Sequence, residues 1–179
     1  MAVERPARAT AVVVMGVAGV GKTTVASALS EALGWPLAEA DAFHSPANIA
    51  KMSAGTPLTD ADREPWLAAM RDWIDEHGSR GEPVVVTCSA LKRSYRDVLR
   101  QAGARVTFVH LVGTAEVIGE RMTHRAGHFM PAELLRSQLD DLQPLEGDED
   151  GVVVDTGKTP AEIVQFVLAR LHPCEGLEL

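Results

Sequence analysis

A glycine-rich stretch near the N-terminus carries the clearest chemical signal in the chain. It fits the template G-x-x-x-x-G-K-S/T at every fixed position and consists of Gly16, Val17, Ala18, Gly19, Val20, Gly21, Lys22 and Thr23. Glycines let the backbone turn so that successive N–H groups point inward at an anion. Lys22 can reach the outer phosphates of a nucleotide, and the Thr23 hydroxyl can ligate a magnesium ion. We therefore interpret the stretch as a nucleotide-binding loop.

The segments on either side of this loop favour the same interpretation. The hydrophobic run Val12–Met15 precedes it and is typical of a buried parallel strand. A helix is expected to begin at Thr24, and the unpaired N–H groups at a helix N-terminus favour a phosphate. A glycine-rich turn that binds nothing is the alternative, and the strand–loop–helix order argues against it.

Composition and charge limit the classes of function. The 179 residues suit a single domain, and 46% hydrophobic with 23% charged residues are typical of a soluble globular protein. A formal net charge of −8 argues against general binding to nucleic acid or to an anionic membrane. Cys88 and Cys174 make no disulfide framework, and no apolar run is long enough to span a bilayer. A cytoplasmic location is expected.

Short apolar runs alternate with helical patterns along the rest of the chain. Strands are expected at Val12–Met15, Trp35–Ala40, Val84–Cys88, Val106–Leu111 and Val152–Val154. This alternation is typical of βαβ units, so the predicted fold class is α/β, with a mostly parallel sheet and helices on both faces. Sites in such sheets lie beyond the carboxyl ends of the strands. The expected site loops are Gly16–Thr24, Asp41–His44, Cys88–Lys92, Gly113–Thr114 and Asp155–Lys158.

Two residues after the second predicted strand are candidates for chemistry. Asp41 closes that strand at the edge where the glycine-rich loop opens. Its carboxylate could hold magnesium, accept a proton from an attacking hydroxyl, or do both, and a helix N-cap is the alternative. His44 is expected to contact a substrate, or else to cap the helix that Ser45 and Pro46 begin.

Cations gather on the helix expected over Ser89–Arg100. Lys92 lies in the first turn of this predicted helix, where a cation gains nothing from the helix dipole, so an anionic ligand is expected there. Arg96 and Arg100 share one face and are expected to be solvated. The acidic stretch Glu146–Asp150 is likewise expected to be a solvated loop.

Arginines elsewhere in the chain suggest contacts to anionic groups. Arg121 and Arg125 are four residues apart and lead into a glycine-containing stretch, and His128 extends the same region. Arginines on a mobile flap can stabilise a transferring phosphoryl group, although two exposed arginines are the alternative. Arg63 could grip a carboxylate through two parallel hydrogen bonds, or pair only with a neighbouring acid.

Several of these blocks together resemble the small bacterial-type gluconokinases, within the wider P-loop kinases of small metabolites. The resemblance rests on GVAGVGKTT, ADAFHSPANIAKM, the stretch Gly55–Leu67, CSALKRSYRD and the stretch Gly127–Gln138. It implies ATP-dependent phosphorylation of D-gluconate to 6-phospho-D-gluconate, with Mg²⁺. It also implies a three-layer P-loop kinase fold with a parallel five-stranded sheet. In a single domain of residues 1–179, a helical substrate-binding segment would span residues 42–78 and a lid residues 121–140.

The resemblance also implies roles for individual residues. Asp41 matches the carboxylate near the attacking hydroxyl, and Arg121 with Arg125 begins the lid. The loop that contains Thr156 and Lys158 would border adenine. Substrate contacts are implied for His44, Arg63, Lys92 and His128.

One departure from the family pattern is mild. Ala18 and Val20 stand where relatives often have serines, which removes two hydroxyls and leaves the backbone cradle intact. Family members are usually dimers, so the resemblance also suggests a homodimer.

Two other interpretations stay open. The same fold could phosphorylate another small hydroxylated metabolite, such as shikimate or a nucleoside monophosphate. Alternatively, the chain could be an ATP-binding module without catalysis, although the arginine-bearing flap argues against this.

Overall fold

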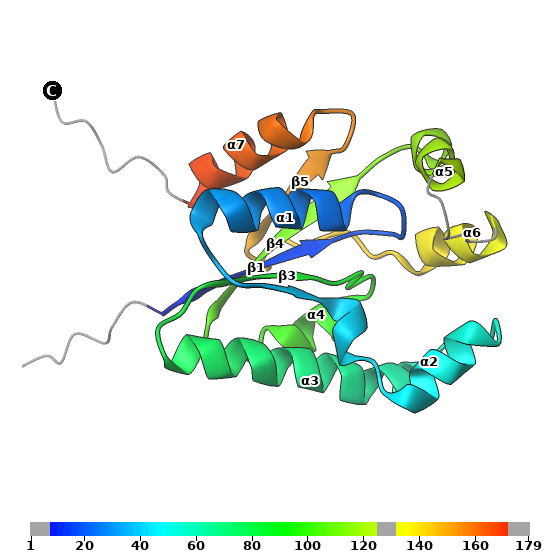
Figure 1. The fold of residues 1–179 in the computed structure, drawn as a ribbon, viewed down its shortest axis with the longest axis horizontal. Coiled ribbons are helices and arrows are strands. Elements are labelled where there is room, and N and C mark those ends of the chain that lie inside the picture. The colour runs from blue at the N-terminus through cyan, green and yellow to red at the C-terminus, as the bar shows by residue number, and fades with distance from the viewer. Residues whose placement is uncertain (1–7, 125–131, 172–179) are drawn as a thin grey trace, which may run out of the picture.

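Parallel strands form a central sheet of five, in the order β2–β3–β1–β4–β5 (Figure 1). The computed structural model describes residues 8–124 and 132–171. The strands are β1 (Thr10–Met15), β2 (Leu37–Glu39), β3 (Val84–Thr87), β4 (Arg105–Val112) and β5 (Gly151–Asp155). Every neighbouring pair is parallel. The predicted α/β class and the five predicted strands are confirmed.

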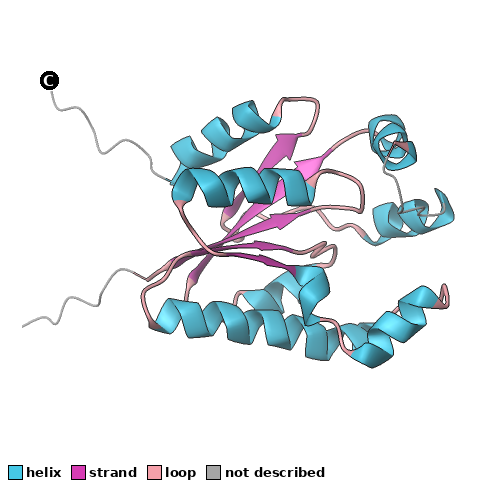
Figure 2. Cartoon of the chain, viewed as in Figure 1, coloured by secondary structure: helices cyan, strands magenta, loops and turns pink. Residues whose placement is uncertain are grey.

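Helices cover both faces of this sheet, as Figure 2 shows. One face carries α1 (Lys22–Leu33) and α7 (Pro160–Leu171), and the other carries α3 (Asp60–Ser79) and α4 (Arg93–Leu99). Beyond the carboxyl ends of the strands lie η1 (Ala40–Phe43), α2 (Pro46–Ser53), α5 (Ala115–Thr123) and α6 (Ala132–Asp141). Of the helices that the structure describes, none combines the length and the apolar composition needed to cross a bilayer.

The central strand β1 supplies both halves of the hydrophobic core. Val12 and Val14 pack with α1 and α7, whereas Val13 and Met15 pack with α3 and α4. Val13 lies opposite Val86 of β3 and Phe108 of β4. A strand that is buried on both faces has a continuous apolar sequence, which is why this run predicts a strand without any alternation. Because β1 is packed on both faces, its carboxyl end fixes the position of the glycine-rich loop that follows.

The start of one helix differs from the prediction, and the start of another is set by its cap. The helix α4 begins only at Arg93, so Lys92 is its N-cap residue rather than part of its first turn. The reason is that Ala90 has a φ of 43°, which a continuous right-handed helix cannot contain. The helix α3 begins at Asp60, because Thr59 forms a reciprocal capping box with the third residue of the helix.

His110 on β4 is a buried titratable group. The residue is 3% exposed, and neither ring nitrogen has a hydrogen-bond partner among the described residues. Burial, followed by the positive charge of Arg96, lowers the pKa of His110 from 6.5 to about 4. The folded protein therefore holds this imidazole in its neutral form at pH values where the unfolded chain binds a proton.

We expect the free energy of unfolding to fall as the pH is lowered through this window. Because the unfolded state binds a proton that the folded state excludes, stability is present above the unfolded pKa and is lost below it. The contribution of His110 is about 2 kcal/mol between about pH 7 and about pH 5. His110→Leu should remove this part of the pH dependence in urea unfolding, whereas the exposed His124→Leu should not. Identical pH profiles for His110→Leu and the wild type would contradict the assignment.

Candidate active site

The glycine-rich loop between β1 and α1 adopts a backbone that requires glycine. Gly16 and Gly21 have φ angles of 143° and 108°, which residues with side chains rarely adopt. A Cβ atom on Gly16 would lie 2.6 Å from the carbonyl oxygen of Leu111, and one on Gly19 would lie 2.5 Å from Cγ of Met122. A side chain at Gly16 or Gly19 would therefore clash with neighbouring atoms as well as strain the backbone.

The loop leads into a helix end that suits an anion. Nζ of Lys22 donates to the carbonyl oxygens of Gly16 and Val17, both at 3.0 Å, so the ammonium group lies over the loop. The N-terminus of α1 has no side-chain cap and no acidic residue in its first turn. Such a helix end, with its dipole, favours a phosphate.

A cavity of about 720 Å³ opens beside this loop. Its volume is that of a small-molecule site. The glycine-rich loop and the first turn of α1 line one side, and α5 lines another. The lining residues are Gly19, Gly21, Lys22, Thr23, Thr24, Glu120, Arg121 and His124.

Arg121 joins the loop to the segment after β5. Its guanidinium group donates to the carbonyl oxygen of Val20 at 3.1 Å and to that of Thr156 at 2.7 Å. Thr156 is itself buried and donates from its hydroxyl to the carbonyl oxygen of Val112 at 3.1 Å. This arrangement brings together three segments that the sequence analysis assigned to nucleotide binding.

Three further predicted residues divide into two groups: Lys158 is described by the structure, whereas Arg125 and His128 are not. Lys158 lies on the same loop as Thr156, and its Nζ atom is 5.6 Å from the ring centroid of Phe166 on α7. Arg125 and His128 lie outside the described residues, so their roles stay predictions.

A carboxylate that the sequence analysis missed lies beside Thr23. Glu39 ends β2, accepts a hydrogen bond from the hydroxyl of Thr87, and lies 3.4 Å from Oγ1 of Thr23. Asp41, which was predicted to close this strand, instead lies in the exposed turn η1. Both acids were visible in the sequence, and only the boundary of β2 decides which one ends the strand.

Lys22 follows β1 and Asp41 follows β2, and both strands pair in parallel with β3, so the two residues lie beyond the same edge of the sheet. Cys88 is completely buried there, and burial raises the pKa of its thiol to about 12. The positive charge of Lys22 and the negative charge of Asp41 also influence this pKa, in opposite directions. The structure therefore brings the predicted cation and the predicted base to the same edge of the sheet.

His44 offers a neutral imidazole next to Asp41. Its ring stacks on Trp66, with 4.6 Å between centroids and 4° between planes, and the indole N–H of Trp66 donates to the carbonyl oxygen of Ala40 at 2.8 Å. Burial lowers the pKa of His44, and the negative charge of Asp41 opposes this effect. Nδ1 of His44 is buried without a hydrogen-bond partner among the described residues. The ring is thus fixed and can bond to a hydroxyl.

Arg63 and Lys92 meet at a tyrosine that the sequence analysis did not single out. Nη1 of Arg63 donates to the hydroxyl of Tyr95 at 3.0 Å. The guanidinium group of Arg63 and the ammonium group of Lys92 each lie 5.6 Å from the centroid of the Tyr95 ring. Two cations predicted separately as substrate contacts are therefore neighbours.

The prediction that Arg96 is solvated is wrong. Its side chain is 0% exposed and forms an ion pair with Glu149, at 2.6 Å and 3.0 Å. Glu149 is also buried, so the acidic stretch is not a fully solvated loop. Arg100, predicted to be solvated too, is partly covered and pairs with Asp97 at 3.1 Å. The error arose because a segment distant in the sequence covers this face of α4.

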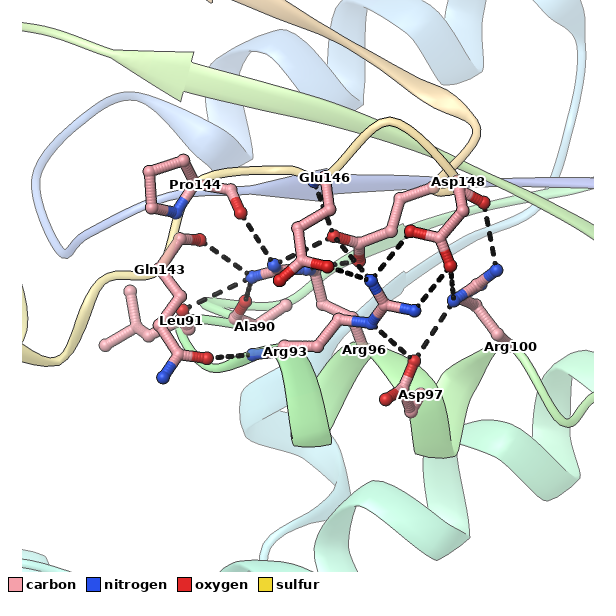
Figure 3. A network of polar contacts seen from close by, with 11 residues as sticks. Ala90, Leu91, Arg93, Arg96, Asp97, Arg100, Gln143, Pro144, Glu146 and Asp148 are labelled. Atoms are coloured by element: carbon pink, nitrogen blue, oxygen red, sulfur yellow. Dashed lines mark hydrogen bonds and ion pairs between the residues drawn. The ribbon is translucent and has the colours of Figure 1, made fainter.

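The buried pair connects two segments that flank the site. The guanidinium group of Arg96 also donates to four carbonyl oxygens, and Figure 3 shows them converging on it. They belong to Ala90, Leu91, Gln143 and Pro144. Because Leu91 directly precedes Lys92 and Gln143 follows α6, the pair holds the Lys92 loop against the end of α6.

The fold and the site together define the class of P-loop kinases, with a phosphate-binding loop between the central strand and the first helix. Residues 12–145 match the AAA domain family. Gluconokinase from Gluconobacter oxydans is 50% identical over 163 residues, which cover 91% of this chain and 91% of that protein. The chain belongs to the gluconokinase family, as the sequence blocks predicted.

Solved structures agree with this placement. An unliganded sugar kinase from Janibacter sp. has a TM-score of 0.87 and 52% identity, covering 94% of this chain and 96% of that one. A gluconokinase from Sinorhizobium meliloti has a TM-score of 0.82 and 50% identity, covering 93% and 94% respectively. The three-layer fold is therefore shared across nearly the whole chain.

We expect Glu149→Gln to lower the free energy of unfolding by about 3–5 kcal/mol, because Arg96 would keep a buried charge without its partner. The double variant Arg96→Met with Glu149→Leu should recover much of this loss, since no charge is then left buried. Urea unfolding measures both effects.

The exposed pair Arg80–Glu76 supplies the control, and Glu76→Gln should change stability little. A Glu149→Gln variant no less stable than Glu76→Gln would show that the buried pair does not hold these segments together.

Proposed function

We propose that this protein transfers the γ-phosphoryl group of ATP to D-gluconate and forms 6-phospho-D-gluconate. D-Gluconate is proposed as the acceptor because similar proteins are named gluconokinases. The observation that carries the proposal is the presence of two candidate anion sites at the same edge of the sheet. One is the glycine-rich loop with Lys22, which suits the phosphates, and the other is the Arg63–Tyr95–Lys92 group, which suits a carboxylate.

We assign the substrate-binding segment of residues 42–78 to α2 and α3, and the lid of residues 121–140 to α5 and α6. All four helices except the far part of α3 lie beyond the carboxyl ends of the strands (Figure 1). The side-chain oxygen of Gln138 on α6 accepts a hydrogen bond from the backbone N–H of Ala18 at 2.7 Å. This contact supports the assignment, because it links the lid to the phosphate-binding loop.

In the proposed reaction, the primary hydroxyl of the sugar acid attacks the γ-phosphoryl group in line with the leaving oxygen. Asp41 accepts the proton of this hydroxyl, and the neutral ring of His44 positions a neighbouring hydroxyl. Lys22 and Arg121 stabilise the negative charge that spreads over the transferring group. Arg125, in the lid, adds to this stabilisation.

The residues near Thr23 fit a magnesium ion. A hydroxyl and a carboxylate, Thr23 and Glu39, lie 3.4 Å apart, and magnesium prefers such oxygen ligands together with water and phosphate oxygens. Asp41 is proposed as a further ligand through water. When bound with ATP, the ion neutralises charge on the phosphates. A cytoplasmic location and a homodimer stay predictions.

The test of this function is a panel of acceptors assayed by ADP release, with D-gluconate, related sugar acids, shikimate and nucleoside monophosphates. Turnover confined to D-gluconate, with 6-phospho-D-gluconate as the product, is the expected result. Turnover with shikimate or a nucleotide instead would replace the proposed acceptor. ATP binding without turnover of any acceptor would favour the non-catalytic module.

The two acids at the end of β2, Glu39 and Asp41, should have separable effects. Glu39→Gln should raise the Mg²⁺ concentration for half-maximal activity by about tenfold, because a group that orients the metal is lost. Asp41→Asn should lower kcat at saturating Mg²⁺ by at least about tenfold, because a positioned base contributes roughly 10²–10⁴.

Glu31→Gln, on the exposed side of α1, is the matched control and should change neither parameter. Unaltered magnesium dependence in Glu39→Gln would remove Glu39 from the metal site. A smaller loss of turnover in Asp41→Asn would rule out Asp41 as the base.

A further inference from the structure

Asp60 lies among the donors that a substrate carboxylate would need. It is the first residue of α3, and its carboxylate accepts hydrogen bonds from the hydroxyl of Tyr95 and from Nζ of Lys92, the latter at 3.2 Å. Nη1 of Arg63 lies 3.8 Å from the same carboxylate. One carboxylate of the protein itself therefore contacts all three groups.

The three donors are mostly covered by the protein, whereas Asp60 is exposed. Tyr95 is only 6% exposed, and the side chains of Arg63 and Lys92, each 26% exposed, lie against its ring. The side chain of Asp60 is 67% exposed. Because an exposed ion pair contributes little net free energy, Asp60 can turn into water at small cost while the donors stay together.

The charges in this cluster would be balanced by a ligand carboxylate in place of Asp60. Arg63 and Lys92 are positive, and Asp60 is the acid in hydrogen-bond contact with Lys92. Asp141 on α6 lies 4.0 Å from Lys92, at the limit of an ion pair. The hydrogen bond from Tyr95, followed by that from Lys92, lowers the pKa of Asp60, so it is ionised at neutral pH. If Asp60 turned away, a ligand carboxylate would restore the balance.

We propose that Asp60 is an internal stand-in for the substrate carboxylate and a determinant of specificity. On binding, the carboxylate of the sugar acid takes the hydrogen bonds of Arg63, Tyr95 and Lys92, and the side chain of Asp60 turns into solvent. A simple anion must displace Asp60 and makes no other contacts that offset the cost. A polyhydroxy acid must displace Asp60 too, but its hydroxyl groups form further hydrogen bonds with the protein. Competition of this kind discriminates between ligands by penalising the wrong one.

The identity of the acid rests on the proposed function, but the role of Asp60 does not. The alternative is that Asp60 only joins α3 to α4 through Tyr95. In that case removing the carboxylate of Asp60 would weaken the binding of every acceptor to the same extent and would lower the stability of the protein. The two roles therefore predict opposite changes in KM.

The test compares Asp60→Asn with the wild type in steady-state kinetics. The KM for D-gluconate should fall about three- to tenfold, the factor of one partly exposed ion pair, with kcat and the KM for ATP unchanged. The KM for an uncharged acceptor, D-gluconamide, should not fall. Acetate and D-lactate should inhibit the variant more strongly than the wild type.

Asp72→Asn is the matched control, because Asp72 is on the same helix, is 68% exposed and pairs only with Arg71 among the contacts of the described residues. It should leave all of these constants unchanged. Tyr95→Phe should raise the KM for D-gluconate and leave that for D-gluconamide unaltered, because it removes a donor to the carboxylate. Asp60→Ser keeps a residue suited to a helix start and provides a second variant should Asp60→Asn fold poorly.

An unchanged or raised KM for D-gluconate in both Asp60 variants would overturn the proposal. So would an equal fall in KM for the charged and the uncharged acceptor. If the wild type phosphorylated a different sugar acid, the proposed acceptor would be wrong, yet the same comparison with that acid would still decide the role of Asp60. Calorimetric titration of the sugar acid without ATP gives the same comparison independently of turnover.

Discussion

Parallel strands that end at one edge are the constraint on which this site depends. Because all five strands of the sheet run the same way, the loops after β1, β2, β3 and β5 open on the same side. They bring the phosphate-binding loop, the two acids at the end of β2, Lys92 and Thr156 to one edge of the sheet. The central strand is buried on both faces, so the loop that it carries cannot shift without disturbing both halves of the core.

Side-chain contacts then connect the loops that follow the strands. Arg121 connects the loop after β1 to the loop after β5, and the pair of Arg96 and Glu149 connects the Lys92 loop to the end of α6. The second connection is buried and uses backbone carbonyl groups, which makes it geometrically strict. These two contacts therefore connect segments that carry predicted site residues.

Much of this architecture could be predicted from the sequence, because local patterns were enough. The run Val12–Met15 and the glycine template that follows it fixed the strand, the turn and the anion site together. What could not be predicted depended on contacts between distant segments. The burial of Arg96 requires Glu149, which lies far along the chain, and a charged helix with no visible partner suggests a solvated face.

The same reason explains the residues that were missed in the site. Glu39 was overlooked because the end of β2 is set by its pairing with β3, which no local pattern in such a short strand reveals. Tyr95 stood beside predicted cations, yet a lone tyrosine on a helix is more often a core residue. Asp60 is exposed, and only the folding of α3 against α4 brings it to Lys92.

The hydrogen bond between Gln138 and Ala18 links α6 to the phosphate-binding loop. It occupies a backbone N–H of the phosphate-binding loop from outside the loop. A phosphate oxygen that claimed this donor would release α6, and a shift of α6 would in turn alter the affinity of the loop for phosphate. Linkage would make the two effects equal in size, so this exchange of one donor would couple occupancy by nucleotide to the position of the helix.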